Sequence, residues 1–414
     1  MALLSLGLLA CLQGCAPLPL VQGETLYVMV VYQNRLDWLR RSDSQDRLWT
    51  PLKEEFRRLQ PNVWLSIYNV SEEHVEEELK LRTARGLGPD LILTRGPVAN
   101  TLLKKGLIAP VPQSPAMATT ISQVEPRYLG RVRKGSTLSG LPIADLVTLA
   151  CFNKAKVTSS PKTTAELMAL AAAGRTVGLS IDTYGLWWTA GTRNVATLLA
   201  SILLGAPLPR GELKPTAESK IAAWLAWLRQ LALLNRVDLA SGPEELTEGL
   251  ISGRLDWIPC YSLTLGLLKR EMGDRLGVAT LPRGEEGEPS PFDTVQVLAF
   301  GLDSSRRQRQ YASNLAQLSL DPLLQRRLIL DRQEALPVNQ FVQIPLASSG
   351  ILVALAEARD QSDKIAAFAK QPFDLHHLNR VVPQVEVIIQ KVMVGVMSPQ
   401  EGAQRILSLD ADQP

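Results

Sequence analysis

Short apolar runs alternate with helical segments near the start of this 414-residue chain, and this alternation restricts the possible folds. Residues 25–33 form a run with apolar residues on both alternating faces, a pattern typical of a strand covered on both sides. An amphipathic segment over 50–59, a second apolar run over 63–68 and a charged helical segment over 72–85 follow. The order strand, helix, strand, helix predicts a mostly parallel sheet flanked by helices, which is an α/β fold.

A third strand is predicted over 91–94, and its end carries the first candidate ligand contacts. Ligands of open α/β sheets bind in the crevice at the carboxyl ends of the strands. Arg95 lies at that end, so we predict that it contacts a ligand. The alternative is that Arg95 only caps a surface loop.

The stretch 140–170 contains a further strand and a capped helix. Gly140-Leu141-Pro142 forms a corner, and the apolar run 146–152 predicts one buried strand. Thr163 and Glu166 have the spacing of a capping box, which predicts the start of a helix there.

Four ordered blocks resemble the extracellular solute-binding proteins of bacterial sugar ABC transporters, the maltose-binding-protein-like family. One block is Gly88-Pro89-Asp90 with its strand, the following helix and Gly-Leu-Ile-Ala-Pro over 106–110. The others are the stretch 140–170, the Val-x-x-Leu-Pro strand within 276–282 and the return at 335–339. The resemblance extends over nearly the whole chain after its N-terminal segment.

The resemblance implies a two-lobed periplasmic-binding-protein fold, type II-like, in which each lobe is a mostly parallel sheet flanked by helices. Crossing strands would form a hinge between the lobes. Residues 1–23 would be a signal or lipoprotein segment. Lobe 1 would comprise 24–145 and 298–345, and lobe 2 would comprise 146–297 and 346–414.

The implied function is that of the substrate-binding component of an ABC importer, not of an enzyme. It would capture a small carbohydrate, either a mono- or disaccharide or a sugar–polyol conjugate, in a cleft between the lobes. By resemblance, Thr94 beside Arg95 would also contact this ligand. The loaded monomer would then dock on the transmembrane permease subunits. The resemblance implies no cofactor and no metal.

Aromatic and polar residues of the second lobe are further candidates for sugar contacts. Sugars pack their C–H faces on aromatic rings and need directional polar partners for their hydroxyls. Tyr184, Trp187 and Trp188 follow a predicted strand, and adjacent indoles cannot face the same way, so one Trp is expected in the core. By resemblance, Tyr261 and Ser262 lie at a ligand-contacting strand end. The family's Trp is missing there, since Leu263 falls near its place.

Two aspartates lie at the predicted crossings between the lobes. By resemblance, Asp145 is near a position that accepts sugar hydroxyls, and Asp293 begins the second crossing strand. The alternative role of Asp145 is that of a salt-bridged hinge residue.

The N-terminal residues 2–14 are almost wholly apolar and precede Cys15. Leu12-Gln13-Gly14-Cys15 resembles a bacterial lipobox, which implies lipidation at Cys15 and anchoring in the periplasm on the outer face of the cytoplasmic membrane. An ordinary cleaved signal or an uncleaved anchor is the alternative. Cys151 and Cys260 lie in apolar runs, and we expect two buried free thiols rather than a disulfide.

Composition and residue patterns weigh against other function classes. A net charge of +3 provides no basic field for nucleic acid. A receptor for polyamine or ferric ion is the nearest alternative, although Tyr184 and Tyr261 are far apart and acidic clusters are few. A secreted glycosidase would need paired carboxylates, and only Asp145 and Asp182 stand at strand ends.

Overall fold

The computed structural model describes residues 23–32, 44–180, 183–205, 207–209, 211–291, 294–330, 332–363 and 375–409. The strands are β1 (Glu24–Tyr32), β2 (Val63–Ser71), β3 (Leu91–Arg95), β4 (Arg133–Lys134), β5 (Thr137–Leu138), β6 (Leu141–Leu146), β7 (Thr148–Asn153), β8 (Val177–Ser180), β9 (Val237–Ala240), β10 (Trp257–Tyr261), β11 (Leu276–Ala279) and β12 (Thr294–Phe300). The α-helices are α2 (Ser44–Leu59), α3 (Val75–Ala84), α4 (Gly96–Lys104), α5 (Pro115–Ile121), α6 (Pro126–Val132), α7 (Thr164–Ala172), α8 (Thr183–Thr192), α9 (Ala196–Leu204), α10 (Lys214–Ala232), α11 (Pro243–Ser252), α12 (Leu265–Met272), α13 (Arg306–Leu318), α14 (Pro322–Gln325), α15 (Gly350–Asp363), α16 (Leu375–Met393) and α17 (Pro399–Ser408). Short 3₁₀ and π segments are η2 (Ser262–Thr264), η3 (Gly273–Arg275), η4 (Arg326–Leu330) and η5 (Leu346–Ser348).

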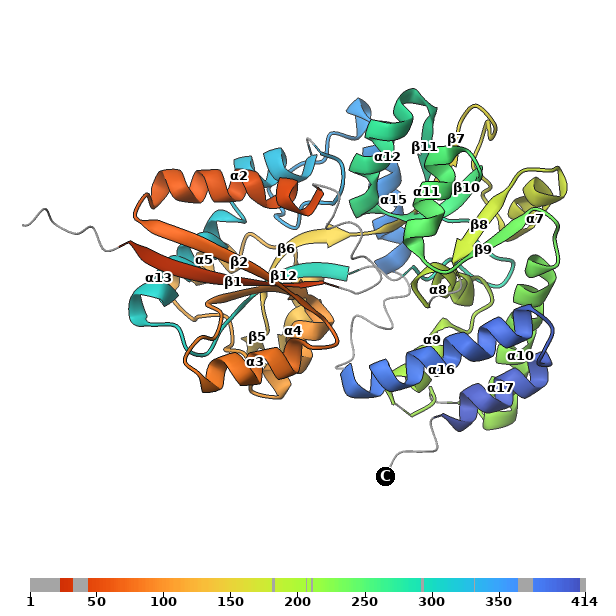
Figure 1. Cartoon of the computed structure of the whole chain (residues 1–414), viewed down its shortest axis with the longest axis horizontal. Coiled ribbons are helices and arrows are strands. Elements are labelled where there is room, and N and C mark those ends of the chain that lie inside the picture. The colour runs from red at the N-terminus through yellow and green to blue at the C-terminus, as the bar shows by residue number, and fades with distance from the viewer. Residues whose placement is uncertain are drawn as a thin grey trace, which may run out of the picture.

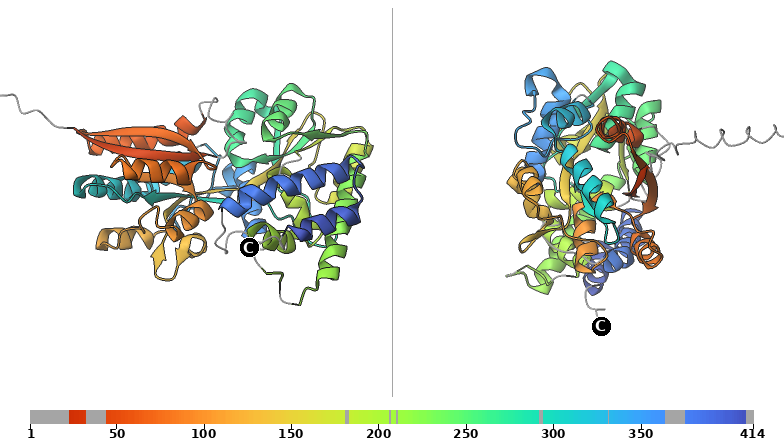
Figure 2. Two further views of the ribbon diagram at one scale, coloured as in Figure 1. Left: turned by 60° about the horizontal axis from the view of Figure 1, so that its bottom comes forward. Right: turned by 90° about the vertical axis from the view of Figure 1, so that its left-hand side faces the viewer.

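The molecule consists of two lobes, each built around one five-stranded sheet (Figure 1). The first sheet has the order β2-β1-β3-β12-β6, and the second has the order β11-β7-β10-β8-β9. The two lobes lie end to end along the long axis of the molecule (Figure 2). This architecture confirms the predicted two-lobed α/β fold, in which both sheets are mixed and flanked by helices.

Each sheet contains one strand that runs against its neighbours. In the first sheet β12 is antiparallel to both β3 and β6, and in the second β7 is antiparallel to both β10 and β11. Both strands begin where the chain enters from the other lobe: β7 starts two residues after β6 ends. A strand that enters at the edge where its neighbours end must run in the opposite direction.

Helices cover both faces of each sheet, which explains why the strands are apolar on both sides. In the first lobe α4 and α6 pack on one face, while α2 and α13 lie on the other. In the second lobe α11, α12 and α15 cover one face, and α8 and α10 lie on the other side with α9, α16 and α17. All six residues of β7 are buried.

Most predicted elements are confirmed, including the capped helix at Thr163, whose hydroxyl accepts a hydrogen bond from Glu166 N at 3.1 Å. The buried strand predicted over 146–152 is present as β7, but its predicted start is wrong, because the run breaks at Val147 and Leu146 ends β6. A continuous apolar run contains no signal for this change of sheet. The strand β9 and the β4–β5 hairpin were not predicted.

One predicted boundary between the lobes does not coincide with the end of a strand. The predicted boundary between 297 and 298 falls inside β12, which is paired in the first sheet from Thr294 onward. Helices α15, α16 and α17 lie with the second sheet (Figure 1).

Among the described helices, none has both the length and the apolar character needed to cross a membrane.

Candidate ligand-binding site

The carboxyl ends of the parallel strands in each lobe lie next to the crossing between the lobes. Thr148, at the start of β7, is paired with Tyr261 at the end of β10. Thr294, at the start of β12, is paired with Leu146 at the end of β6. Strand ends of both sheets therefore meet around the crossing, where the two lobes adjoin (Figure 1). This is the part of an α/β sheet that can present polar side chains to a ligand.

Arg95 lies at the end of β3, as predicted, and its guanidinium binds the carboxylate of Glu72. Nη2 of Arg95 lies 2.5 Å from Oε1 of Glu72, and Nε lies 3.1 Å from Oε2. The side chains are 10% and 11% exposed. Glu72 directly follows β2, so the ion pair spans the end of the intervening strand β1. Arg95 is thus held in a fixed orientation at the carboxyl edge.

Glu72 and Gln296 are two polar residues of this edge that were missed from the sequence. Gln296 is paired with Arg95 across the β3–β12 ladder, and directly paired residues project from the same face. The sequence placed Glu72 in a charged helix and Gln296 inside an apolar strand. The strand-end rule could have identified Glu72, since it follows the second strand directly.

Thr94 points to the opposite face from Arg95, because adjacent residues of a strand alternate. Its side chain is 2% exposed, and among the described residues Oγ1 has no hydrogen-bond partner. A contact between Thr94 and a ligand stays a prediction.

Asp145 lies in a buried polar network on β6. Its carboxylate accepts a hydrogen bond from Tyr128 Oη at 3.1 Å and pairs with Arg131 Nη1 at 3.5 Å. Burial and the nearby Asp145 carboxylate raise the pKa of Tyr128 well above its ordinary value, so the hydroxyl stays protonated and donates. The backbone of Asp145 also pairs with Leu336. This is the geometry of the salt-bridged hinge residue that the sequence left as an alternative.

The structure does not bring Asp145 and Arg95 onto one face of the sheet. Asp145 is paired with Val295 of β12, whereas Arg95 is paired with the next residue, Gln296. Consecutive residues of a strand project to opposite faces. A ligand contact by Asp145 stays a prediction, because its carboxylate already binds Tyr128 and Arg131.

Trp187 and Trp188 lie in α8 and are both buried, at 3% and 0% exposed. Trp188 packs edge to face against Trp257 of β10, with ring centroids 6.3 Å apart. The expectation that one of the two lies in the core is met by Trp188, and a stacking role for either indole stays a prediction. The side chain of Tyr184 lies outside the described part of the structure. Trp224 and Trp227 of α10 are also buried and belong to the core.

Tyr261 and Ser262 lie at the end of β10, as predicted. Ser262 N donates to Val147 O at 2.9 Å, and Ser262 Oγ accepts from Val147 N at 3.3 Å. Ser262 therefore connects β10 to the crossing residue, while Tyr261 is partly exposed. Asp293 and Cys15 lie outside the described residues.

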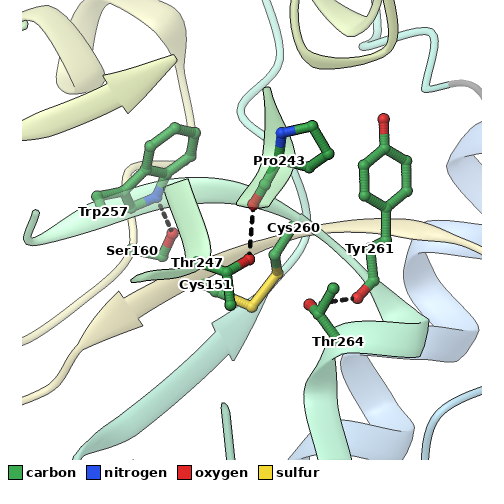
Figure 3. The surroundings of a disulfide bond; sticks show 8 residues. All are labelled: Cys151, Ser160, Pro243, Thr247, Trp257, Cys260, Tyr261 and Thr264. Carbon is green, nitrogen blue, oxygen red and sulfur yellow. Dashed lines mark hydrogen bonds between the residues drawn. A yellow bond between two sulfur atoms is a disulfide. The ribbon is translucent and has the colours of Figure 1, made fainter. Parts of the chain in front are cut away.

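Cys151 and Cys260 form a disulfide between β7 and β10, so the expectation of two free thiols is wrong. Their Cα atoms are 5.8 Å apart, which is within the range that a disulfide spans. Cys260 is paired with Leu149 and Cys151 with Ile258, which makes the cysteines diagonal neighbours on adjacent strands. Figure 3 shows the bridge just before Tyr261, whose ring points away from it. The sequence could not reveal the pairing of strands 109 residues apart.

No group of three or more His, Cys, Asp or Glu side chains that could hold a metal ion occurs within the described residues. The polar groups at the two strand edges are instead a mixture of donors and acceptors. Such a set can hold a neutral polar solute by hydrogen bonds.

The sheets, their shared crossing and the polar strand ends define a two-lobed α/β binding protein. Over residues 53–343 the chain matches the family described as bacterial extracellular solute-binding proteins, and it belongs to that family. The family consists of solute-binding proteins rather than enzymes. A search of curated proteins finds no significant match.

Solved structures with the same fold cover 94% of the chain. The GacH receptor of Streptomyces glaucescens, solved unliganded and with acarbose, has a TM-score of 0.72, 18% identity and 100% of its own chain covered. The maltose/maltodextrin-binding domain MalE from Bdellovibrio bacteriovorus, bound to maltotriose, has a TM-score of 0.70 and 14% identity, with 99% of that chain covered. An ABC transporter solute-binding protein from Thermotoga lettingae, bound to α-D-tagatose, has a TM-score of 0.65 and 15% identity, with 100% of that chain covered.

Proposed function

We propose that this protein is the substrate-binding component of an ABC importer and that it captures a small carbohydrate between its lobes. The observation that carries the proposal is the meeting of two polar strand edges at the crossing: Glu72 and Arg95 come from the first lobe, and Tyr261 comes from the second. The similar structures hold acarbose, maltotriose and tagatose, which favours a carbohydrate for this chain.

The proposed ligand contacts follow from the position of each side chain. Arg95 and Tyr261 are the first choices, because both lie at strand ends beside the crossing. Asp145 and Ser262 rank lower, because they already bind Tyr128, Arg131 and the Val147 backbone, and Thr94 and the two indoles rank lower because they are at most 3% exposed. Tyr184 and Asp293 remain candidates from the sequence alone.

We divide the chain at the crossings in this proposal. Lobe 1 comprises 24–146 and the segment that begins at Thr294 and includes β12, α13 and α14. Lobe 2 comprises the residues between these two parts and the C-terminal helices α15, α16 and α17. Hinge motion about the crossings would close the lobes on the ligand. The loaded protein, a monomer without enzymatic activity, would then present both lobes to the transmembrane permease subunits.

We further propose a periplasmic location with a lipid anchor at Cys15. The disulfide supports a location outside the cytoplasm, because disulfides persist in oxidising compartments. Labelling cells with a palmitate analogue tests the anchor: the protein should carry the label, and Cys15→Ala should abolish it. A protein that is exported but unlabelled would refute the anchor.

A thermal-shift screen of residues 22–414 tests the binding function. Mono-, di- and trisaccharides, sugar–polyol conjugates, polyamines and ferric iron form the panel. A ligand at a hundred times its dissociation constant stabilises the fold by about 2.7 kcal/mol. We expect a shift with a sugar and none with polyamine or iron. A shift with polyamine or iron alone would replace the sugar assignment, and cleavage of a glycoside would indicate the glycosidase.

Arg95→Ala should abolish the shift, whereas Arg58→Ala should leave it unchanged. Arg58 is a matched control, because it also pairs with a glutamate of the first lobe, Glu55, but with its side chain 68% exposed. The unliganded melting temperature of each variant separates loss of binding from loss of stability. Equal effects of the two substitutions would remove Arg95 from the site.

A further inference from the structure

Glu72, Arg95 and Gln296 lie together at the carboxyl edge of the first sheet, and the charges of Glu72 and Arg95 balance each other. The guanidinium of Arg95 and the carboxylate of Glu72 form a bidentate pair in which both side chains are about nine-tenths buried. Charge-assisted pairs of this geometry are among the stronger hydrogen-bonded interactions in proteins. The pair therefore presents a donor group and an acceptor group, but little net charge.

An acidic ligand would interact unfavourably with this arrangement. A ligand carboxylate or phosphate that approached Arg95 would have to compete with Glu72 for the same N–H groups. It would also lie close to the negative charge of Glu72, and water screens this repulsion only weakly at a nearly buried site. A neutral hydroxyl meets neither penalty.

Gln296 adds a side-chain acceptor to this edge. Its side-chain oxygen, Oε1, is buried and lacks a hydrogen-bond donor within the described part of the chain. The residue stands opposite Arg95 on the neighbouring strand, so the two side chains project from one face. An orphaned buried acceptor is costly unless a donor reaches it, and a hydroxyl can donate whereas an ionised carboxylate cannot.

We infer that Glu72 and Gln296 are specificity-determining residues, which make the site select uncharged polyhydroxyl ligands and reject sugar acids and sugar phosphates. The inference rests on the proposed function, because it concerns the same site. Glu72 acts by neutralising Arg95 and by accepting a hydrogen bond from a ligand hydroxyl. Gln296 acts by accepting a further hydrogen bond from a ligand hydroxyl.

Isothermal calorimetry with matched ligand pairs tests the inference. Each neutral sugar is measured beside its acidic analogue, glucose with glucuronate and glucose 6-phosphate, and maltose with maltobionate. The wild-type protein should bind the neutral member of a pair at least tenfold more tightly. Glu72→Gln should weaken neutral binding about tenfold and strengthen acidic binding about tenfold, because it releases the charge of Arg95.

Two further variants and a control make the test specific. Glu72→Asp keeps the charge and should preserve the neutral preference. Gln296→Leu should weaken neutral binding about tenfold without gaining affinity for acids, because it removes an acceptor and no charge. Glu76→Gln is the matched control, since Glu76 pairs with Lys105 in the same lobe and should not change the selectivity.

The possible failures are distinguishable. If the wild type binds neutral sugars but Glu72→Gln keeps its selectivity while remaining folded, the inference is overturned and the proposed function stands. Equal or tighter binding of acidic analogues by the wild type also overturns the inference. If the wild type binds neither member of any pair, the proposed carbohydrate function fails, and the inference fails with it.

Discussion

The two lobes share one sheet plan but differ in what fills the region next to the crossing. In the first lobe, buried charged groups occupy it: the Glu72–Arg95 pair on one face and the network of Asp145, Tyr128 and Arg131 on the other. In the second lobe, a disulfide and a cluster of buried tryptophans lie behind the strand ends. The same topology therefore supports two different kinds of interior.

The second lobe is therefore built for rigidity, and the first lobe is built to discriminate between ligands. A disulfide and large aromatic side chains fix the second sheet without directional demands on a ligand. Buried hydrogen-bonding groups in the first lobe are selective, because a ligand must match each donor and acceptor. We expect substitutions in the second lobe to reduce stability first, and substitutions at Glu72, Arg95 and Gln296 to change affinity and selectivity first.

The largest effect is expected from Trp188→Ala. The indole is fully buried and packs on Trp257, so its removal leaves a large cavity and should cost about 3–5 kcal/mol in the free energy of unfolding. Urea denaturation measures the loss. Trp64→Ala, a substitution of an indole that is 66% exposed on β2, should cost much less. A loss of sugar affinity without a loss of stability would instead make Trp188 a ligand contact.

Removal of the disulfide should have the next largest effect on stability. The bridge closes a loop of 109 residues, and Cys151→Ala with Cys260→Ala should cost about 2–5 kcal/mol in the free energy of unfolding. A reductant should destabilise the wild type in the same way and leave the double variant unchanged. Hydrogen exchange should show the loss of protection in β7 and β10, while β1 to β3 keep theirs. Uniform loss across both sheets would show that the lobes unfold as one unit.

Asp145→Asn should destabilise the first lobe by a smaller amount, about 1–3 kcal/mol in the free energy of unfolding. The amide can still accept a hydrogen bond from Tyr128, but the buried Arg131 loses its opposite charge. Urea denaturation measures the loss. Asp274→Asn is the control, because Asp274 lies at an exposed position of the second lobe. An unchanged stability together with a loss of sugar affinity would favour the ligand-contact role.

The sequence predicted the elements well, because apolar periodicity and helix caps are local signals. The charged helix predicted over 72–85 contains α3, and the cap at Thr163 is present. The sequence could not predict which strands are neighbours, and this limit explains the errors at the site. The disulfide depends on β7 lying beside β10, and the position of Gln296 opposite Arg95 depends on the register of β12 against β3. Both are long-range pairings for which a single sequence offers no local signal.

The smallest effect is expected at an ion pair that joins the lobes. Nη1 of Arg127 in α6 lies 3.7 Å from Oδ1 of Asp360 in α15, and the two side chains are 40% and 62% exposed. An exposed pair contributes at most about 1 kcal/mol and is screened by salt. Asp360→Asn should therefore leave the free energy of unfolding nearly unchanged, and yet alter sugar affinity by a few-fold at low salt, because the pair biases the relative position of the lobes.

Calorimetry at low salt and at about 0.5 M salt measures this effect, which should vanish at high salt since the Debye length falls to a few ångströms. Asp274→Asn serves again as the control. If Asp360→Asn changed stability as much as Asp145→Asn, the contact between α6 and α15 would be part of a common core rather than an adjustable contact. Closure of the lobes would then have to break buried structure between α6 and α15 rather than a solvated ion pair.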